Sequence, residues 1–163
     1  MNFNGASLTN LFELSDNNKL MVLDWRNNEN IRKWMHNSDI ISQDEHFTFI
    51  DTLKNNKTKQ YYLVSLNESY IGVIYFTNID KINKTSEFGI YSNPNLKGNG
   101  KVLMDVICEY SFNILNSHKI VSEVFENNQR AINLYQYFNF KKSGEKLFNN
   151  TKIIYMELEN ENR

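Results

Sequence analysis

The sequence predicts a protein of the α/β class (α+β), with a central mixed, mostly antiparallel sheet of about seven strands flanked by helices. Apolar residues recur at spacings of three and four in some segments and alternate in others, which separates helices from strands. The segments follow the order strand, three helices, three strands, helix, strand, helix and two strands, which is not a regular βα alternation. No repeat or Pro/Ser-rich linker divides the chain, so we expect one domain over residues 1–163.

The first part of the chain is expected to form one strand and three helices. Asp16 is the expected N-cap of the first helix. The third helix has the clearest start, because Ser42 is followed three residues later by Glu45 in a capping-box pattern. The expected bounds are a strand over 8–14 and helices over 16–26, 30–35 and 42–53.

The second part of the chain is expected to contain six strands and two helices. Asn67-Glu68-Ser69 predicts a tight hairpin turn, and Asn149-Asn150 predicts the turn between the last two strands. The last helix carries its apolar residues at spacings of three and four, which indicates one buried face. The expected strands are 60–66, 70–78, 87–91, 119–125, 141–148 and 152–158, and the helices run from 102 to 115 and from 127 to 138.

Composition excludes several function classes. The net charge of -1 argues against nucleic acid as a partner, since nucleic-acid-binding domains are usually basic. No apolar stretch reaches membrane-spanning length and no leader pattern is visible at Met1, so we expect a cytoplasmic protein with no membrane partner. The three histidines and the single cysteine are scattered, so no metal is expected, and Cys108 is expected to be a buried core thiol.

The most informative segment is a glycine-bearing loop between an expected strand and an expected helix. Gly98 and Gly100 follow the strand that ends near Tyr91, and the helix begins near Val102. A loop of this kind turns several backbone N–H groups toward one point at a helix N-terminus, which favours a phosphate group. The sequence therefore predicts a phosphorylated ligand.

The spacing of the glycines separates the known kinds of phosphate loop. Val102 follows Lys101 where a P-loop has Ser or Thr, and Leu103 stands where a dinucleotide-binding loop has its third glycine. Residues 95–100 resemble the Gln/Arg-x-x-Gly-x-Gly/Ala loop of the GCN5-related N-acetyltransferases (GNAT), with Asn95 in place of Gln or Arg. Residues 128–135 resemble that family's Asn-x-x-Ala-hydrophobic-x-x-Tyr motif, although Asn139 replaces the customary Gly that follows it.

This resemblance covers nearly the whole chain and implies a GNAT fold that uses acetyl-CoA as acetyl donor. The loop amides would hold the pyrophosphate, the strand after Gly89 would align the pantetheine arm, and one N–H there would polarise the thioester. Asn128 and Ala131 belong to the second motif and would contact CoA with Tyr135. The implied cofactor-binding residues of the loop and strand are Ile90, Tyr91, Ser92, Leu96, Lys97, Gly98, Asn99, Gly100 and Lys101.

The resemblance also implies the acid of the reaction and leaves the base open. Tyr135 matches the family tyrosine that protonates the departing thiolate, although its spacing alone also suits a core tyrosine. The acceptor ammonium must lose a proton to a carboxylate, a histidine or water. Glu123, Glu87 and His46 are the candidates, and we place Glu123 first; both glutamates also suit exposed ion pairs.

The segment from Trp25 to His46 gives the expected acceptor. Within the superfamily it resembles the N-acetyltransferases of pseudaminic acid biosynthesis, a pathway of flagellin glycosylation. These acetylate the 4-amino group of a UDP-linked 4-amino-4,6-dideoxy sugar by direct transfer. Arg26 would pair with phosphate, His46 would add a donor, and Trp34 or Met35 would offer an apolar face. Core packing of Trp34 and Met35 and an ion pair of Arg26 are the alternatives.

Two other functions remain open from the sequence. One is an acetyltransferase for a protein N-terminus or a polyamine, although a polyamine enzyme should have an acidic acceptor region and residues 25–46 mix both charges. The other is a non-catalytic acyl-CoA-binding module, against which Asn128 and Tyr135 count. Exposed strand edges in this fold also allow a homodimer.

Overall fold

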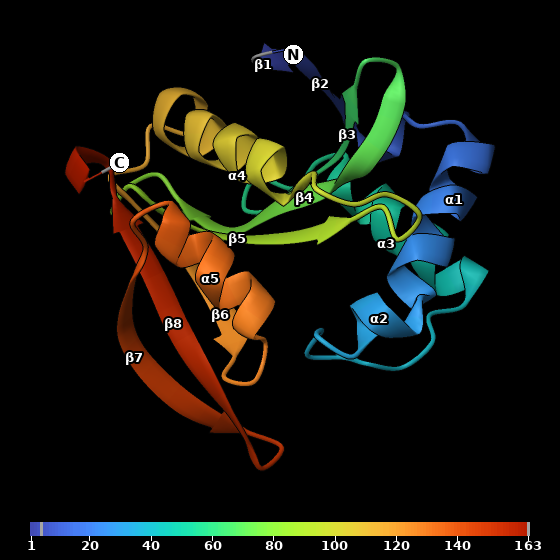
Figure 1. Ribbon diagram of the computed structural model, residues 1–163. Coiled ribbons are helices and arrows are strands. Elements are labelled where there is room, and N and C mark those ends of the chain that lie inside the picture. Colours follow the sequence, from blue (N-terminus) through green and yellow to red (C-terminus); the bar gives the residue numbers. More distant parts are fainter. Residues whose placement is uncertain (4, 163) are drawn as a thin grey trace.

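A computed structural model describes residues 1–3 and 5–162 of the chain and shows helices packed on both faces of one twisted sheet (Figure 1). The N-terminal part contains β1 (Asn2–Phe3), β2 (Ala6–Asn10), the 3-10 turn η1 (Leu11–Glu13), α1 (Asp16–Asn27), α2 (Glu29–Arg32) and α3 (Gln43–Leu53). The remaining elements are β3 (Gln60–Leu66), β4 (Ser69–Asp80), β5 (Thr85–Ser92), α4 (Gly100–Glu109), the π-helical turn η2 (Tyr110–Ile114), β6 (Lys119–Phe125), α5 (Gln129–Tyr137), β7 (Lys141–Phe148), β8 (Thr151–Glu159) and η3 (Asn160–Asn162).

The sheet has the order β1-β2-β3-β4-β5-β6-β8-β7. Neighbouring strands are antiparallel except for β5 and β6, which are parallel. The expectation of a mixed, mostly antiparallel sheet of about seven strands is confirmed, because the eighth strand of the described residues is the two-residue β1.

Two apolar cores lie on opposite faces of this sheet. Successive residues of a strand point to opposite faces, so Leu63 and Val73 face α1 and α3 while Val64 and Ile74 face α4. The core beneath α4 and α5 is the larger and includes Cys108, which is buried as expected. In Figure 1, α4 and α5 lie together over one face and α1 and α3 lie over the other.

The expected strand over 8–14 is wrong at its C-terminal half. β2 ends at Asn10, and Leu11–Glu13 form a 3-10 turn. The apolar residues Leu8, Leu11 and Leu14 are three apart, whereas a half-buried strand needs alternation. The chain leaves the sheet so that Leu11 and Leu14 can pack into the core beneath α1 and α3.

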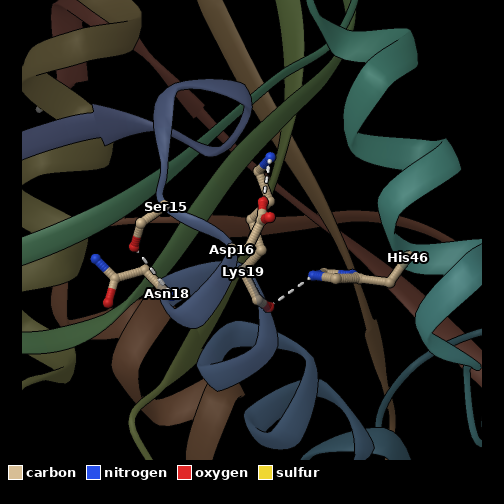
Figure 2. Close-up of polar contacts among 5 residues, drawn as sticks. All are labelled: Ser15, Asp16, Asn18, Lys19 and His46. Atoms are coloured by element: carbon tan, nitrogen blue, oxygen red, sulfur yellow. Dashed lines mark hydrogen bonds and ion pairs between the residues drawn. The ribbon is translucent and has the colours of Figure 1, made fainter.

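The helix starts were predicted with mixed success. Ser15, not Asp16, is the N-cap of α1, because the Ser15 Oγ accepts a hydrogen bond from the Asn18 N–H (Figure 2). The capping box of α3 is confirmed: Glu45 N–H donates to Ser42 Oγ, and Ser42 N–H donates to the Glu45 carboxylate. α2 is shorter than the expected helix over 30–35 and ends at Arg32.

The strands of the second part follow the sequence more closely. β3, β6 and β7 have the expected bounds, whereas β4 and β5 are longer at both ends. The first hairpin turn contains only Asn67 and Glu68, both in the left-handed region with φ of 48° and 64°, and Ser69 already belongs to β4. Such paired positive φ values match the right-handed twist of the flanking strands.

The two parallel strands separate partway along their length, and this feature positions the site. β5 and β6 pair only through Thr85–Lys119, Ser86–Ile120 and Glu87–Val121. Beyond these pairs β5 continues to Ser92 beside β4, and β6 continues to Phe125 beside β8. An opening therefore forms in the middle of the sheet, where the facing backbone groups of β5 and β6 have no strand partner among the described residues.

Gly89 lies at this opening opposite Tyr75 of β4, and the pair requires a glycine. A Cβ at position 89 would lie 1.9 Å from Tyr75 Cζ and 2.1 Å from its Oη. The Tyr75 ring therefore lies directly across β5, in space that any other residue would fill.

We predict that Gly89→Ala lowers the free energy of unfolding by displacing the Tyr75 ring. The loss should be smaller when Tyr75→Ala is already present, with a coupling of roughly 0.5–3 kcal/mol between the two sites. Urea unfolding of the two single variants and the double variant measures this coupling. Additive losses would contradict the close contact.

Candidate active site

Three tyrosines and one arginine line the α1 and α3 side of the sheet next to the opening. Tyr61 and Tyr75 stack with ring centroids 4.7 Å apart, and Tyr75 lies across Gly89. Burial raises the pKa of Tyr61, Tyr75 and Tyr91, while the positive charge of Arg26 acts in the opposite direction on all three. The three hydroxyls are therefore neutral near pH 7. We call these four residues the tyrosine–arginine cluster.

Arg26 has an unused donor within this cluster. Its Nη2 donates to the Asn37 carbonyl at 2.6 Å, but its buried Nη1 has no hydrogen-bond partner in the described part of the chain. Leaving a charged buried donor unsatisfied is costly. Arg26 is thus able to donate to an anionic or carbonyl group of a ligand.

Tyr135 reaches the opening from the opposite face. It lies on α5 and is 4% exposed, with its ring centroid 5.4 Å from that of Phe88 on β5. Ser122 Oγ on β6 donates to the Tyr135 hydroxyl at 3.5 Å, so the tyrosine touches residues of both separated strands. Burial raises the pKa of Tyr135 to about 12, which keeps the phenol protonated near neutral pH. The site therefore contains a buried acid beside the opening.

The glycine loop offers free amides, with one correction. Leu96 N–H already donates to the Asn93 carbonyl at 3.1 Å, so it is not one of the anion-binding amides. The N–H groups from Lys97 to Lys101 have no hydrogen-bond partner among the residues that the structure describes. Gly98 has a φ of +88°, which favours glycine, and a Cβ on Gly100 would lie 3.2 Å from Leu134. The helix α4 begins directly behind these amides.

The second motif also has a structural role. Asn128 is the N-cap of α5, and its Oδ1 accepts a hydrogen bond from Ala131 N–H at 3.3 Å. The Ala131 amide is therefore occupied, whereas the Asn128 Nδ2 remains available for a ligand carbonyl. Ile90, Tyr91 and Ser92 lie on the separated part of β5, where an extended ligand chain would find unpaired backbone groups.

The two candidate carboxylates lie on the same face of the sheet but differ in their contacts. Glu123 Oε2 lies 2.7 Å from His36 Nε2, and Glu123 Oε1 lies 2.7 Å from Lys146 Nζ. The Glu87 side chain makes no hydrogen bond or ion pair within residues 1–3 and 5–162. Sequence reasoning missed His36 and Lys146, because they are separated from Glu123 by 87 and 23 residues and belong to no motif.

His46 was expected to contact substrate phosphate, and the structure gives it a different role. Its side chain is 5% exposed and lies between α3 and α1, where Nε2–H donates to the Lys19 carbonyl at 2.9 Å (Figure 2). Burial lowers the pKa of His46, with the hydrogen bond to Lys19 opposing that shift and the charge of Arg26 adding to it. Packing of the two helices buries this ring, and the expected contact of His46 with substrate stays a prediction that its hydrogen bond to Lys19 does not support.

Trp34 and Met35 lie half-buried in the turn that follows α2. Their N–H groups donate to the Ile31 and Arg32 carbonyls, which holds the turn that leads into His36. Neither side chain belongs to the two cores that the described residues form.

Two features are absent from the described residues. No group of three or more His, Cys, Asp or Glu side chains gathers there in a way that suits a metal ion. None of the helices described is both long and apolar enough to cross a membrane.

An anion-binding loop, a separated pair of parallel strands and a protonated buried tyrosine define a class of protein, the acetyl-CoA-dependent N-acetyltransferases. Residues 19–140 match the model of the Acetyltransferase (GNAT) family. The chain belongs to this family.

Two relatives from Campylobacter jejuni, both named Acetyltransferase PseH, are 38% and 40% identical to this chain over 133 residues. In each case the match covers 82% of this chain and 83% of the relative. The crystal structure of C. jejuni N-acetyltransferase PseH in complex with acetyl coenzyme A superposes with a TM-score of 0.78 at 33% identity, covering 94% of this chain and 98% of that one. Spermidine N-acetyltransferase from Vibrio cholerae in complex with CoA and spermine has a TM-score of 0.87 at 23% identity, over 98% of both chains, and shares the fold.

These comparisons confirm the GNAT fold, the activity of an acetyl-CoA-dependent N-acetyltransferase (an acyltransferase) and acetyl-CoA as the donor. A non-catalytic acyl-CoA-binding module is not favoured. The roles of the individual site residues stay predictions.

We predict that His46 makes the protein less stable in acid. Its pKa is lowered in the folded state, so the unfolded chain binds the proton more readily, and stability is lost as the pH falls below about 6.5. His46→Gln should flatten this loss in urea unfolding between pH 5 and 8. The exposed His118 provides the matched control, and His118→Gln should keep the wild-type slope. An unchanged slope in His46→Gln would contradict the buried, neutral ring.

We predict that Tyr135→Phe lowers kcat by roughly 10²–10⁴-fold, because the thiolate loses its proton donor. The KM for acetyl-CoA should change little, since the ring is retained. Thiol release measures both parameters, and Tyr137→Phe is the control because Tyr137 is 63% exposed on the same helix. Full turnover by Tyr135→Phe would exclude this acid.

Proposed function

We propose that this chain transfers the acetyl group of acetyl-CoA directly to the 4-amino group of a UDP-linked 4-amino-4,6-dideoxy sugar in pseudaminic acid biosynthesis. The observation that carries the choice of acceptor is the unused, buried Nη1 of Arg26. It lies among neutral tyrosines on the side of the sheet opposite Tyr135. The similarity to the two PseH relatives supports the same choice.

The charge of the tyrosine–arginine cluster favours an anionic acceptor over a polyamine. Arg26 places a fixed positive charge there, and the tyrosines stay neutral. A polycation would be repelled by Arg26, whereas a diphosphate would accept hydrogen bonds from its guanidinium. Acetylation of a polyamine or of a protein N-terminus is thus disfavoured by electrostatics.

On the donor side, the proposed contacts follow the free groups of the protein. The amides of Lys97, Gly98, Asn99, Gly100 and Lys101 would hold the CoA pyrophosphate at the N-terminus of α4. The pantetheine arm would add to the separated edge of β5 as an extra strand does. An N–H in the segment 90–92 would then polarise the thioester carbonyl, and Tyr135 would protonate the thiolate.

The wider setting of the reaction is also proposed. We propose that the protein acts in the cytoplasm, where acetyl-CoA and nucleotide sugars are available. Its product would then be used for flagellin glycosylation. Residues 1–163 would act as one domain without nucleic acid, membrane or metal. The strand β7 lies at one edge of the sheet and would serve a homodimer.

We predict that free CoA is released from acetyl-CoA in the presence of a UDP-linked 4-amino-4,6-dideoxy sugar, but not of spermidine or a peptide. Thiol release measured on this panel of three amines tests the acceptor directly. Release with spermidine alone would favour the polyamine activity. Release with none of the amines, despite acetyl-CoA binding, would favour a binding module.

Arg26 gives a sharper form of the same test. Arg26→Gln should raise the KM for the nucleotide sugar about 10–100-fold. This increase corresponds to the loss of one charge-assisted hydrogen bond, which contributes about 1.5–3 kcal/mol. The KM for acetyl-CoA should stay unchanged. Lys57→Gln removes one positive charge at an exposed residue and serves as the matched control.

A further inference from the structure

We propose that His36 is the general base of this reaction and that Glu123 is a positioning residue, which holds the His36 imidazole toward the acceptor. The inference rests on the proposed transfer of acetyl to an amine. It begins from one contact, in which His36 Nε2 lies 2.7 Å from Glu123 Oε2.

Glu123 is poorly suited to remove a proton by itself. Both of its oxygens already accept hydrogen bonds, one from His36 and the other from Lys146. Its side chain is 18% exposed, and the contact with Glu123 raises the pKa of Lys146, which remains charged. Each oxygen of the Glu123 carboxylate is thus already engaged by a neighbouring side chain.

The same contact prepares the imidazole of His36. When Nε2–H donates to a carboxylate, the lone pair of the neutral ring lies on Nδ1. In the described part of the chain, Nδ1 has no hydrogen-bond partner. The ring is held edge-on to Phe148 with centroids 5.0 Å apart and also lies near Phe125, at 6.0 Å. The carboxylate and the two aromatic rings therefore fix both the tautomer and the direction of His36.

The position of His36 suits an acceptor that enters opposite the acid. Glu123 lies two residues beyond Val121, the last residue of β6 paired with β5. Ser122 points toward Tyr135 on α5, so Glu123, the next residue, points to the other face. In Figure 1 the chain after α2 approaches the end of β6 where the strands have separated. The acid and the base would thus meet the thioester from opposite faces.

The ionisable groups around His36 are few. Glu123 on β6 contacts His36 directly, and Lys146 on β7 donates to the other oxygen of the Glu123 carboxylate. On β8, the Tyr155 ring centroid lies 5.4 Å from Lys146 Nζ. On the segment of His36 itself, the guanidinium of Arg32 donates to the Ser38 carbonyl. The His36 side chain is 48% exposed, so a proton taken up by it can pass to solvent.

The proton balance of the step is complete. His36 Nδ1 takes one proton from the acceptor ammonium and later releases it to solvent. The amine nitrogen then bonds to the thioester carbon, and the C–S bond breaks as the tetrahedral adduct collapses. Tyr135 gives its proton to the thiolate. The second proton lost from nitrogen replaces the one that Tyr135 has given. Amide, CoA and one released proton are the products.

The test compares pH profiles of kcat/KM with the best acceptor of the amine panel. In His36→Gln, kcat/KM at pH 7 should fall by about 10²-fold or more, and the acidic limb of the pH profile should disappear. Glu123→Gln should lower kcat/KM but retain the acidic limb, because the imidazole is still present while its positioning carboxylate is gone. His118→Gln is the matched control and should behave as wild type, since His118 is exposed and its side chain contacts Lys84, far from the site in sequence. An acidic limb that persists in His36→Gln and vanishes in Glu123→Gln would return the role of base to Glu123.

Chemical rescue separates catalysis from structure. Added imidazole should restore a measurable part of the activity of His36→Ala, which a lost packing contact would not regain. Unchanged acetyl-CoA affinity of the variant shows that the donor site is intact. No rescue in a variant that binds acetyl-CoA normally would overturn the assignment.

A readout without acceptor keeps this inference separate from the proposed function. The ¹⁵N chemical shifts of His36 in the protein alone should report the Nε2–H tautomer at pH 8, and the Nδ1–H tautomer would overturn the inference. If wild-type protein releases CoA with none of the three amines, the proposed function fails, whatever the tautomer. If it releases CoA and His36→Gln keeps its acidic limb, only the role of His36 fails.

Discussion

The separation of β5 from β6 after three residue pairs is the constraint on which the rest of the structure depends. Buried backbone N–H and C=O groups need partners, and two parallel strands that diverge leave their facing groups without any. β4 and β8 hold the outer sides of these strands, so the opening cannot close by local adjustment. A ligand with amides of its own, such as the pantetheine arm of acetyl-CoA, would supply the missing partners.

The two helical layers give the opening its chemistry, each from one face. α4 and α5 bring free loop amides and the protonated Tyr135, which suit an anionic donor and a thiolate leaving group. On the other face, α1 carries Arg26 and the turn after α2 leads to His36. The stacked Tyr61 and Tyr75 of this face lie on β3 and β4. Burial keeps the tyrosines neutral, so Arg26 supplies the fixed charge of the tyrosine–arginine cluster.

Local patterns predicted most of the elements correctly, and the errors have physical causes. The strand β6 and the capping box of α3 depend on side-chain alternation and on residues three apart, which the sequence displays directly. The strand over 8–14 failed because Leu8, Leu11 and Leu14 follow a period of three, and the core rather than strand propensity decided their path. The N-cap of α1 is Ser15 rather than the expected Asp16, although both residue types cap helices well.

The sequence by itself determined the family and the acetyl donor, because the glycine loop and the motif over residues 128–135 are local patterns that the family shares. Only the tertiary structure decided the acceptor side. It buried His46 between two helices, left Arg26 with a free donor, and joined His36, Glu123 and Lys146. These three residues are far apart along the chain, and no local pattern records contacts that form only when separate layers pack together.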